Sequence, residues 1–414
     1  MNRSLMETDM QDTTVKSPIA RKPVARRRLM IASLLGMTTL GAVQVLPAVA
    51  LEMMGENLGL DFQQKGLMFS LRIFTAIPIL LLIGHYAERP YKRHILFWGL
   101  MALVLGQILT AEAVAYGPLL SAMAISGVGF GVVEAIVAPL VAQLYPKRSA
   151  WALNIINAVF ALGMVIGALS AGELLQAGYG WRISFWLWIL PPTVCAFLYM
   201  TPRYPTPSPH ADSFHVTPDV KGFLASPLFW LLSAGMVLAG GCEAGLTSWA
   251  PNFAAEELGA SARGGAWTTI LYGSLMAAGR FGTGALVTRI KPFRLMVVSA
   301  VLCGAVMLGL YFVSTLTTAW VLFALGGLFI ACFWPTLLAM ASDHISIGST
   351  SLFSLMAAAG VLGAVLVPWA IGALGNLSGL RAGILVLPSL MAAMVVVLFA
   401  ASRYMRRNSN SPQQ

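Results

Sequence analysis

The sequence consists of long apolar stretches, each about the length of a membrane-crossing helix, separated by short polar segments. A helix needs about 20 predominantly apolar residues to cross a bilayer. The apolar runs are continuous, whereas the strands of a membrane barrel alternate apolar and polar residues. The pattern therefore predicts helices over residues 29–51, 66–87, 94–115, 118–144, 150–176, 181–201, 226–250, 265–288, 294–314, 318–341, 350–374 and 381–402.

The longest polar stretch between predicted helices divides them into two sets of six. Short motifs also recur about 200 residues apart, such as Gly180-Trp181-Arg182 and Gly379-Leu380-Arg381. Repeats of this kind are typical of transporters built from two similar halves. We therefore predict an all-α polytopic membrane protein with two pseudo-symmetric six-helix bundles. Its predicted parts are a disordered tail (1–28), an N-terminal bundle (29–201), a cytoplasmic central loop (202–224), a C-terminal bundle (225–402) and a tail (403–414).

Composition and charge agree with a membrane location. Only 10% of residues are charged and 58% are hydrophobic, whereas about 25% charged residues are usual in soluble domains. The net charge of +10 gathers at the ends of apolar runs, which argues against nucleic-acid binding. The basic loops alternate with acidic ones, so the positive-inside rule places both termini in the cytoplasm. We expect a multi-pass protein of a bacterial inner membrane.

Signatures of enzymes, metals and nucleotides are missing from the sequence. The four cysteines stand singly inside apolar stretches, and no histidine has a partner at metal-ligand spacing. There is neither a Walker A loop nor a nucleophile–base pattern. We therefore expect no enzyme activity, no metal and no cofactor.

The loop after the second predicted helix reads GHYAERPYKR and resembles a motif of the major facilitator superfamily. The family pattern has a glycine, an acid and then basic residues, with Glu88 here in place of the usual aspartate. The resemblance implies that this motif locks the cytoplasmic side in one state of the cycle. The alternative is a charge cluster that only sets topology. The motif residues are Gly84, Glu88, Arg89, Lys92 and Arg93.

A narrower resemblance connects the chain to the fucose permease family of sugar:proton symporters. It rests on segments in both halves: GVGFGVVEAIVAP (127–139), LNIINAVFALG (153–163), GGCEAGLTSWAPNFAAEEL (240–258), GRFGTGALVTR (279–289) and WPT (334–336). Two features depart from the family pattern. The first predicted helix has no acid before Glu52, and Ala138 replaces an asparagine of the fourth helix.

Four ionisable residues lie well inside predicted spans: Arg72, Glu134, Glu243 and Arg280. Charges are costly in hydrocarbon, so each should face protein or a water-filled path. Glu134 shares a helical face with Gly127, Gly131 and Ala138. The fucose permease resemblance implies that Glu134 binds substrate and carries protons. The alternative is a permanent ion pair with Arg72, and a pair that switches would serve both purposes.

The charges of the second half also allow two interpretations. Arg280 could clamp a carboxylate, or it could brace backbone carbonyls near the cytoplasmic gate. Glu243 could hold a sugar that stacks on the indole of nearby Trp249, or make a satisfied contact between helices. The predicted substrate lining is completed by polar and aromatic residues: Gln44, Asn154, Asn157, Trp249, Tyr272 and Trp334.

Together these features predict a secondary active transporter that works by alternating access. The first hypothesis is proton-coupled uptake of a sugar or similar polar solute. The alternatives are an organic-anion transporter, proton-coupled efflux of an amphipathic compound, and a membrane sensor that no longer transports. The expected partners are a small-molecule substrate and the lipid bilayer, with no nucleic acid, and the expected state is a monomer.

Overall fold

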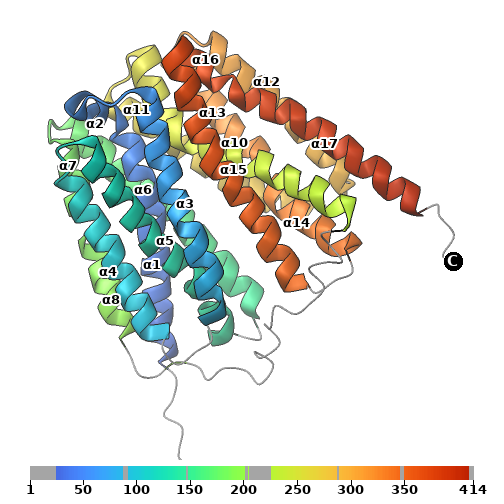
Figure 1. Ribbon diagram of the computed structural model, residues 1–414, viewed down its shortest axis with the longest axis horizontal. Coiled ribbons are helices and arrows are strands. Elements are labelled where there is room, and N and C mark those ends of the chain that lie inside the picture. Colours follow the sequence, from blue (N-terminus) through green and yellow to red (C-terminus); the bar gives the residue numbers. More distant parts are fainter. Residues whose placement is uncertain are drawn as a thin grey trace, which may run out of the picture.

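The computed structural model describes residues 25–86, 92–145, 148–200, 204, 225–286, 289–345 and 349–409. All of its regular structure over these residues is helical (Figure 1). The helices of the N-terminal half are α1 (Arg26–Val49), α2 (Leu51–Leu58), α3 (Phe62–Tyr86), α4 (Lys92–Ala111), α5 (Tyr116–Leu144), α6 (Ser149–Gln176), α7 (Trp181–Leu187) and α8 (Leu190–Tyr199). Those of the C-terminal half are α10 (Pro227–Leu258), α11 (Ala262–Leu286), α12 (Pro292–Phe312), α13 (Leu316–Ile330), α14 (Phe333–His344), α15 (Ser349–Ser378), α16 (Leu380–Ile384) and α17 (Val386–Ser409).

These helices confirm the predicted all-α membrane fold. In the described part of the chain, ten helical segments are long and apolar enough to cross a membrane. Three of them contain a short break, between α7 and α8, α13 and α14, and α16 and α17. The helices α3 and α11 fall outside that set, although each has 25 residues, enough to span a bilayer.

The ends of several helices differ from the predicted boundaries. The first helix begins at Arg26, inside the predicted tail 1–28, and α17 continues to Ser409, inside the predicted tail 403–414. The short helix α2 was not predicted; it ends where Gly59 adopts a left-handed conformation with φ 62°. The helix predicted over 226–250 also ends later than expected. Helix α10 runs through Pro251 to Leu258.

Within each half, two long helices cross so closely that only glycine fits. A Cβ atom on Gly163 of α6 would lie 2.1 Å from the backbone oxygen of Thr38 in α1. The same crossing recurs in the second half, where a Cβ on Gly363 of α15 would lie 1.9 Å from the backbone oxygen of Val237 in α10. Small residues of this kind allow membrane helices to approach backbone to backbone. The numbering offset of about 200 matches the repeat in the sequence.

The repeated glycine-apolar-arginine motifs also have equivalent positions. Arg182 donates a hydrogen bond of 2.8 Å to the carbonyl of Ala113, just beyond α4. Arg381 donates one of 2.7 Å to the carbonyl of Val313, just beyond α12. Each arginine thus binds a carbonyl left free where a helix ends, which explains why the motif occurs once in each half.

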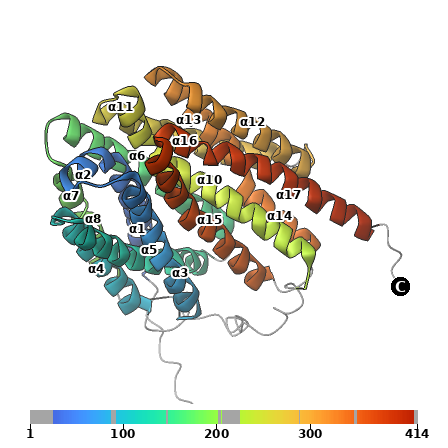
Figure 2. The ribbon, with the colours of Figure 1, turned by 45° about the horizontal axis from the view of Figure 1, so that its top comes forward.

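The two halves meet mainly along two helix pairs, α3 with α15 and α6 with α11, and α1 and α2 also contact α10. The helices converge at the end that carries α2 and α16 and spread apart toward the other end (Figures 1 and 2). We call the converging end the outer end, because it lies opposite the basic loops. Among the described residues, the hydrogen bonds and ion pairs that join the two halves lie toward this outer end. The structure is therefore closed on the outer side.

Candidate functional site

Glu134 lies on α5, and the small residues of this helix pack against α3. A Cβ on Gly127 would lie 2.1 Å from the backbone oxygen of Arg72, so the two helices cross in backbone contact there. The side chain of Glu134 itself is exposed, and it forms no ion pair or hydrogen bond with another described residue. A charged group in the middle of a span is costly against lipid. Glu134 is therefore best placed to face water between the halves.

The side chain of Arg72 does not pair with Glu134, so the predicted ion pair is absent from this structure. Arg72 is 7% exposed and donates from Nη1 to the carbonyl of Val43 over 3.1 Å. That carbonyl lacks its usual helical donor, because Pro47 stands four residues later and has no N–H. The guanidinium also lies 5.5 Å from the ring centroid of Phe130. Arg72 thus repairs a helix defect in α1 and does not neutralise the carboxylate.

The second pair of mid-span charges is joined. Nη2 of Arg280 on α11 lies 3.2 Å from Oε1 of Glu243 on α10. The Arg280 side chain is 42% exposed and that of Glu243 is 29% exposed. An ion pair this exposed inside a membrane-spanning bundle must contact water. It therefore offers both a hydrogen-bond acceptor and a positively charged donor to a solute.

The predicted lining residues fall into two groups. Gln44 and Trp334 are half-buried and Asn157 is exposed, although its amide already donates to the carbonyl of Leu153. Trp249 and Tyr272 are buried, so neither presents a surface to a solute in this conformation. The side chain of Asn154 lies outside the described residues.

Trp249 makes structural contacts that its position in the sequence did not indicate. Its indole donates to the carbonyl of Pro368 in α15 over 3.1 Å, and its ring lies 6.2 Å from that of Phe62. It therefore supports the closed outer end. The predicted pairing of Trp249 with Glu243 around one sugar is not formed in this conformation.

The cytoplasmic gating motif is only partly described. Gly84 belongs to α3, whereas Glu88 and Arg89 lie outside the described residues. Lys92 is buried and donates to Oε1 of Gln143 over 2.9 Å. Arg93 donates to Nε2 of its neighbour His94. The gating role therefore stays a prediction.

Contacts at the outer end are the part of the site that sequence reasoning missed. Lys65 on α3 is 3.0 Å from Oε1 of Glu256 on α10, and it is nearly buried. The amide oxygen of Asn376 on α15 accepts hydrogen bonds from the backbone N–H groups of Phe62 and Gln63. These partners lie far apart in the chain and share no motif. The only signal was the number of acidic residues that the sequence places on this side.

The comparisons with known proteins agree with this architecture. The cyanate transport protein CynX of Escherichia coli (strain K12) is 25% identical over 334 residues, which cover 77% of this chain and 84% of that protein. A bacterial homologue of the human lysosomal transporter Spinster, solved in an inward-facing and occupied conformation, has a TM-score of 0.75 at 18% identity over 94% of this chain and 99% of its own. The nucleoside transporter NupG, as a mutant, has a TM-score of 0.78 at 9% identity over 91% of this chain and 99% of its own.

The two structural neighbours support the fold, and the family follows from the sequence. The narrower resemblance to fucose permeases stays a prediction, as does the monomeric state. The sequence model of the Major Facilitator Superfamily matches residues 29–345. The chain therefore belongs to the major facilitator superfamily, and it is a multi-pass membrane transporter of small molecules and not an enzyme.

Proposed function

We propose that this protein is a secondary active transporter that carries a small anion together with a proton, by alternating access, in the cytoplasmic membrane of a bacterium. The observation that supports this proposal best is the exposed ion pair of Arg280 and Glu243, 3.2 Å apart. A guanidinium binds a carboxylate or a similar planar anion through parallel hydrogen bonds. A substrate anion can therefore take the place of the Glu243 carboxylate on Arg280.

Charge balance supports coupling to a proton. With Glu134 and Glu243 ionised and Arg72 and Arg280 positive, the four mid-span groups carry no net charge. An anion that enters alone would add one uncompensated negative charge to a low-dielectric bundle, which is unfavourable. If one carboxylate takes up a proton at the same time, the net charge stays as it was. Glu134 supports this role, since it is exposed and has no ion pair among the described residues.

The similarity to a cyanate transporter also favours an anion. Cyanate is a small linear anion, and Arg280 is the type of group that would bind one. Few side-chain amides in the predicted lining are available to bind sugar hydroxyls: Gln44 is half-buried, and the amide of Asn157 already donates to the carbonyl of Leu153. Sugar transport remains the second candidate, because Glu134 and Asn157 are both exposed and their side-chain oxygens can accept hydrogen bonds from sugar hydroxyls.

Uptake by proteoliposomes separates these two functions. Labelled cyanate, labelled monocarboxylates and a labelled hexose would be offered under an inward proton gradient. We expect anions to accumulate and Arg280→Gln to lower that uptake at least tenfold. A matched control is Arg263→Gln, which alters an exposed arginine of the same helix at the outer end. Accumulation of the hexose without any anion would contradict the proposal.

Coupling is tested by Glu134→Gln in the same vesicles. We expect this variant to exchange anions across the membrane without accumulating them under the proton gradient, because it lacks the titrating carboxylate. If Glu134→Gln accumulates anions as well as the parent protein does, the proton is carried elsewhere.

A further inference from the structure

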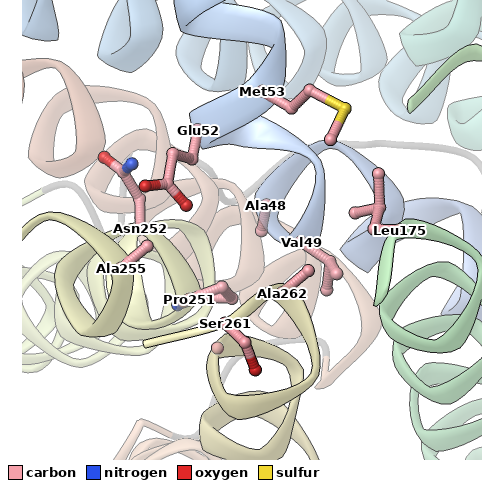
Figure 3. A pocket seen from close by; sticks show the side chains of 11 residues that line it. Ala48, Val49, Glu52, Met53, Leu175, Pro251, Asn252, Ala255, Ser261 and Ala262 are labelled. Atoms are coloured by element: carbon pink, nitrogen blue, oxygen red, sulfur yellow. The ribbon is translucent and has the colours of Figure 1, made fainter. Parts of the chain in front are cut away.

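A small cavity lies between the two halves in the closed outer end (Figure 3). Its walls come from α1, α2 and α6 of one half and from α10 and α11 of the other. The volume is about 50 Å³, and about 10–15 Å³ suffices for one water molecule. The polar side chains in its lining are Glu52, Asn252 and Ser261. Because both halves form its walls, the cavity exists only while the outer end is closed.

Asn252 needs a partner inside this cavity. Its side chain is 1% exposed, and neither its amide nitrogen nor its amide oxygen has a hydrogen-bond partner among the described residues. A buried polar group that stays unpaired destabilises the state in which it is buried. Ser261 already accepts a hydrogen bond from the N–H of Gly264. The side chain best placed to serve Asn252 is that of Glu52, which lines the same cavity and whose carboxyl group points toward the amide in Figure 3.

The surroundings of Glu52 disfavour its ionised form. Burial raises the pKa of Glu52, the carboxylates of Glu256 and Glu56 raise it further, and Lys65 lowers it. Lys65 is itself paired with Glu256. The other charged residues at the outer ends of these packed helices are paired: Glu173 of α6 with Arg263 of α11, and Glu257 of α10 with Arg381. When the halves separate on the outer side, Glu52 regains water and Glu256 moves away with α10.

We propose that Glu52 and Asn252 form a proton-binding site in the closed outer gate. The neutral carboxylic acid of Glu52 donates a hydrogen bond to the amide oxygen of Asn252, directly or through water held in the cavity. Closure of the outer gate therefore takes up a proton from the outer solution, and opening releases it. This inference concerns the gate and not the substrate site, so it stands whatever solute the protein carries.

The sign of the pH dependence follows from linkage. Because the closed state has the higher Glu52 pKa, it binds the proton more tightly than the open state. The extra stability of the closed state is fully present below the ordinary carboxyl pKa of the open state. It is lost as the pH rises through the raised pKa of the closed state. Each unit of difference between the two pKa values changes the closed-to-open ratio about tenfold.

Distance measurement between two spin labels on the outer turns tests the proposal. Val114→Cys and Ser314→Cys place labels at exposed, equivalent turns of the two halves, and the native cysteines are buried. We expect double electron–electron resonance to show the closed distance more often at pH 5 than at pH 8. Glu52→Gln should make the distribution independent of pH, since glutamine can donate to Asn252 at any pH. Glu56→Gln, on the same helix, should keep the pH dependence.

Three results would overturn the proposal. The first is that Glu52→Gln keeps the pH dependence of the parent protein. The second is that Glu56→Gln abolishes it, which would assign the proton to the neighbouring carboxylate. The third is that the gate closes with sodium concentration at constant pH and that Glu52→Gln abolishes this response, which would make the cavity a metal-ion site.

Discussion

The ion pair of Lys65 and Glu256 provides the strongest test of how the outer gate is held closed. The Nζ–Oε1 distance is 3.0 Å, and the side chains are 5% and 34% exposed. Lys65 also lies 5.1 Å from the ring centroid of Phe62. Because the two residues belong to different halves, the pair breaks whenever the outer end opens. Its energy therefore contributes directly to the balance between the closed and open states.

The expected effect of Lys65→Met follows from these exposures. Removing one partner of a buried ion pair costs about 3–5 kcal/mol, because the other charge stays buried. Here Glu256 is one-third exposed, so water recovers part of that cost, and we expect about 1–3 kcal/mol. In the open state both side chains meet water, and the substitution costs little. The closed-to-open ratio should therefore fall about 5- to 150-fold.

The measurement uses the spin labels on Val114→Cys and Ser314→Cys at one fixed pH. The matched control is Arg263→Gln, which breaks a second ion pair between the halves. Its two side chains, Arg263 and Glu173, are each about half exposed (53% and 50%), and exposed pairs contribute only about 0–1 kcal/mol. If the two variants shift the distance distribution equally, burial does not decide the strength of these contacts and the reasoning is refuted.

Two further predictions concern stability in detergent. Gly163→Ala should lower the melting temperature by about 2–8 °C, because overpacking costs about 1–3 kcal/mol. The control Gly273→Ala has open space around its Cβ and should leave the melting temperature unchanged or raise it. Equal effects of the two substitutions would contradict the backbone crossing. Arg381→Lys should destabilise more than Arg182→Lys in thermal unfolding, because Arg381 also binds the Glu257 carboxylate with its Nε over 2.9 Å and more backbone carbonyls. Equal effects would show that these additional contacts do not stabilise the fold.

Much of the fold followed from the sequence because its determinants are local. Apolar run length predicted the helices, and the repeat of about 200 residues predicted two similar halves. The glycines at 163 and 363 and the motifs around Arg182 and Arg381 then took equivalent places. Helix α2 was missed, because it is a short helix of 8 residues that does not cross the bilayer.

The candidate site was less predictable, because side-chain direction depends on neighbouring helices. Both Arg72 and Glu134 lie well inside predicted spans, but position along a helix does not say which way an arginine side chain turns. The signal that could have found its partner was Pro47, since a proline inside a helix frees a carbonyl four residues earlier. Trp249 was predicted beside Glu243, although six residues along a helix correspond to a rotation of about 240°. That rotation carries the indole away from the carboxylate and toward α15.

The contacts across the outer end had no local signal at all. Lys65 and Glu256 are 191 residues apart, and their meeting depends on how two complete bundles dock. Opposite charges in the outer loops only indicated that such pairs were available.

The backbone crossings at Gly163 and Gly363 have a mechanical consequence. Where two helices touch through backbone atoms, no rotamer change can absorb a displacement between them, so each half moves as a stiff lever. A lever of fixed shape transmits a small rotation at one end as a proportionate opening at the other. A solute that moves one half relative to the other therefore changes the outer end through the backbone, and no relay of side-chain movements is needed.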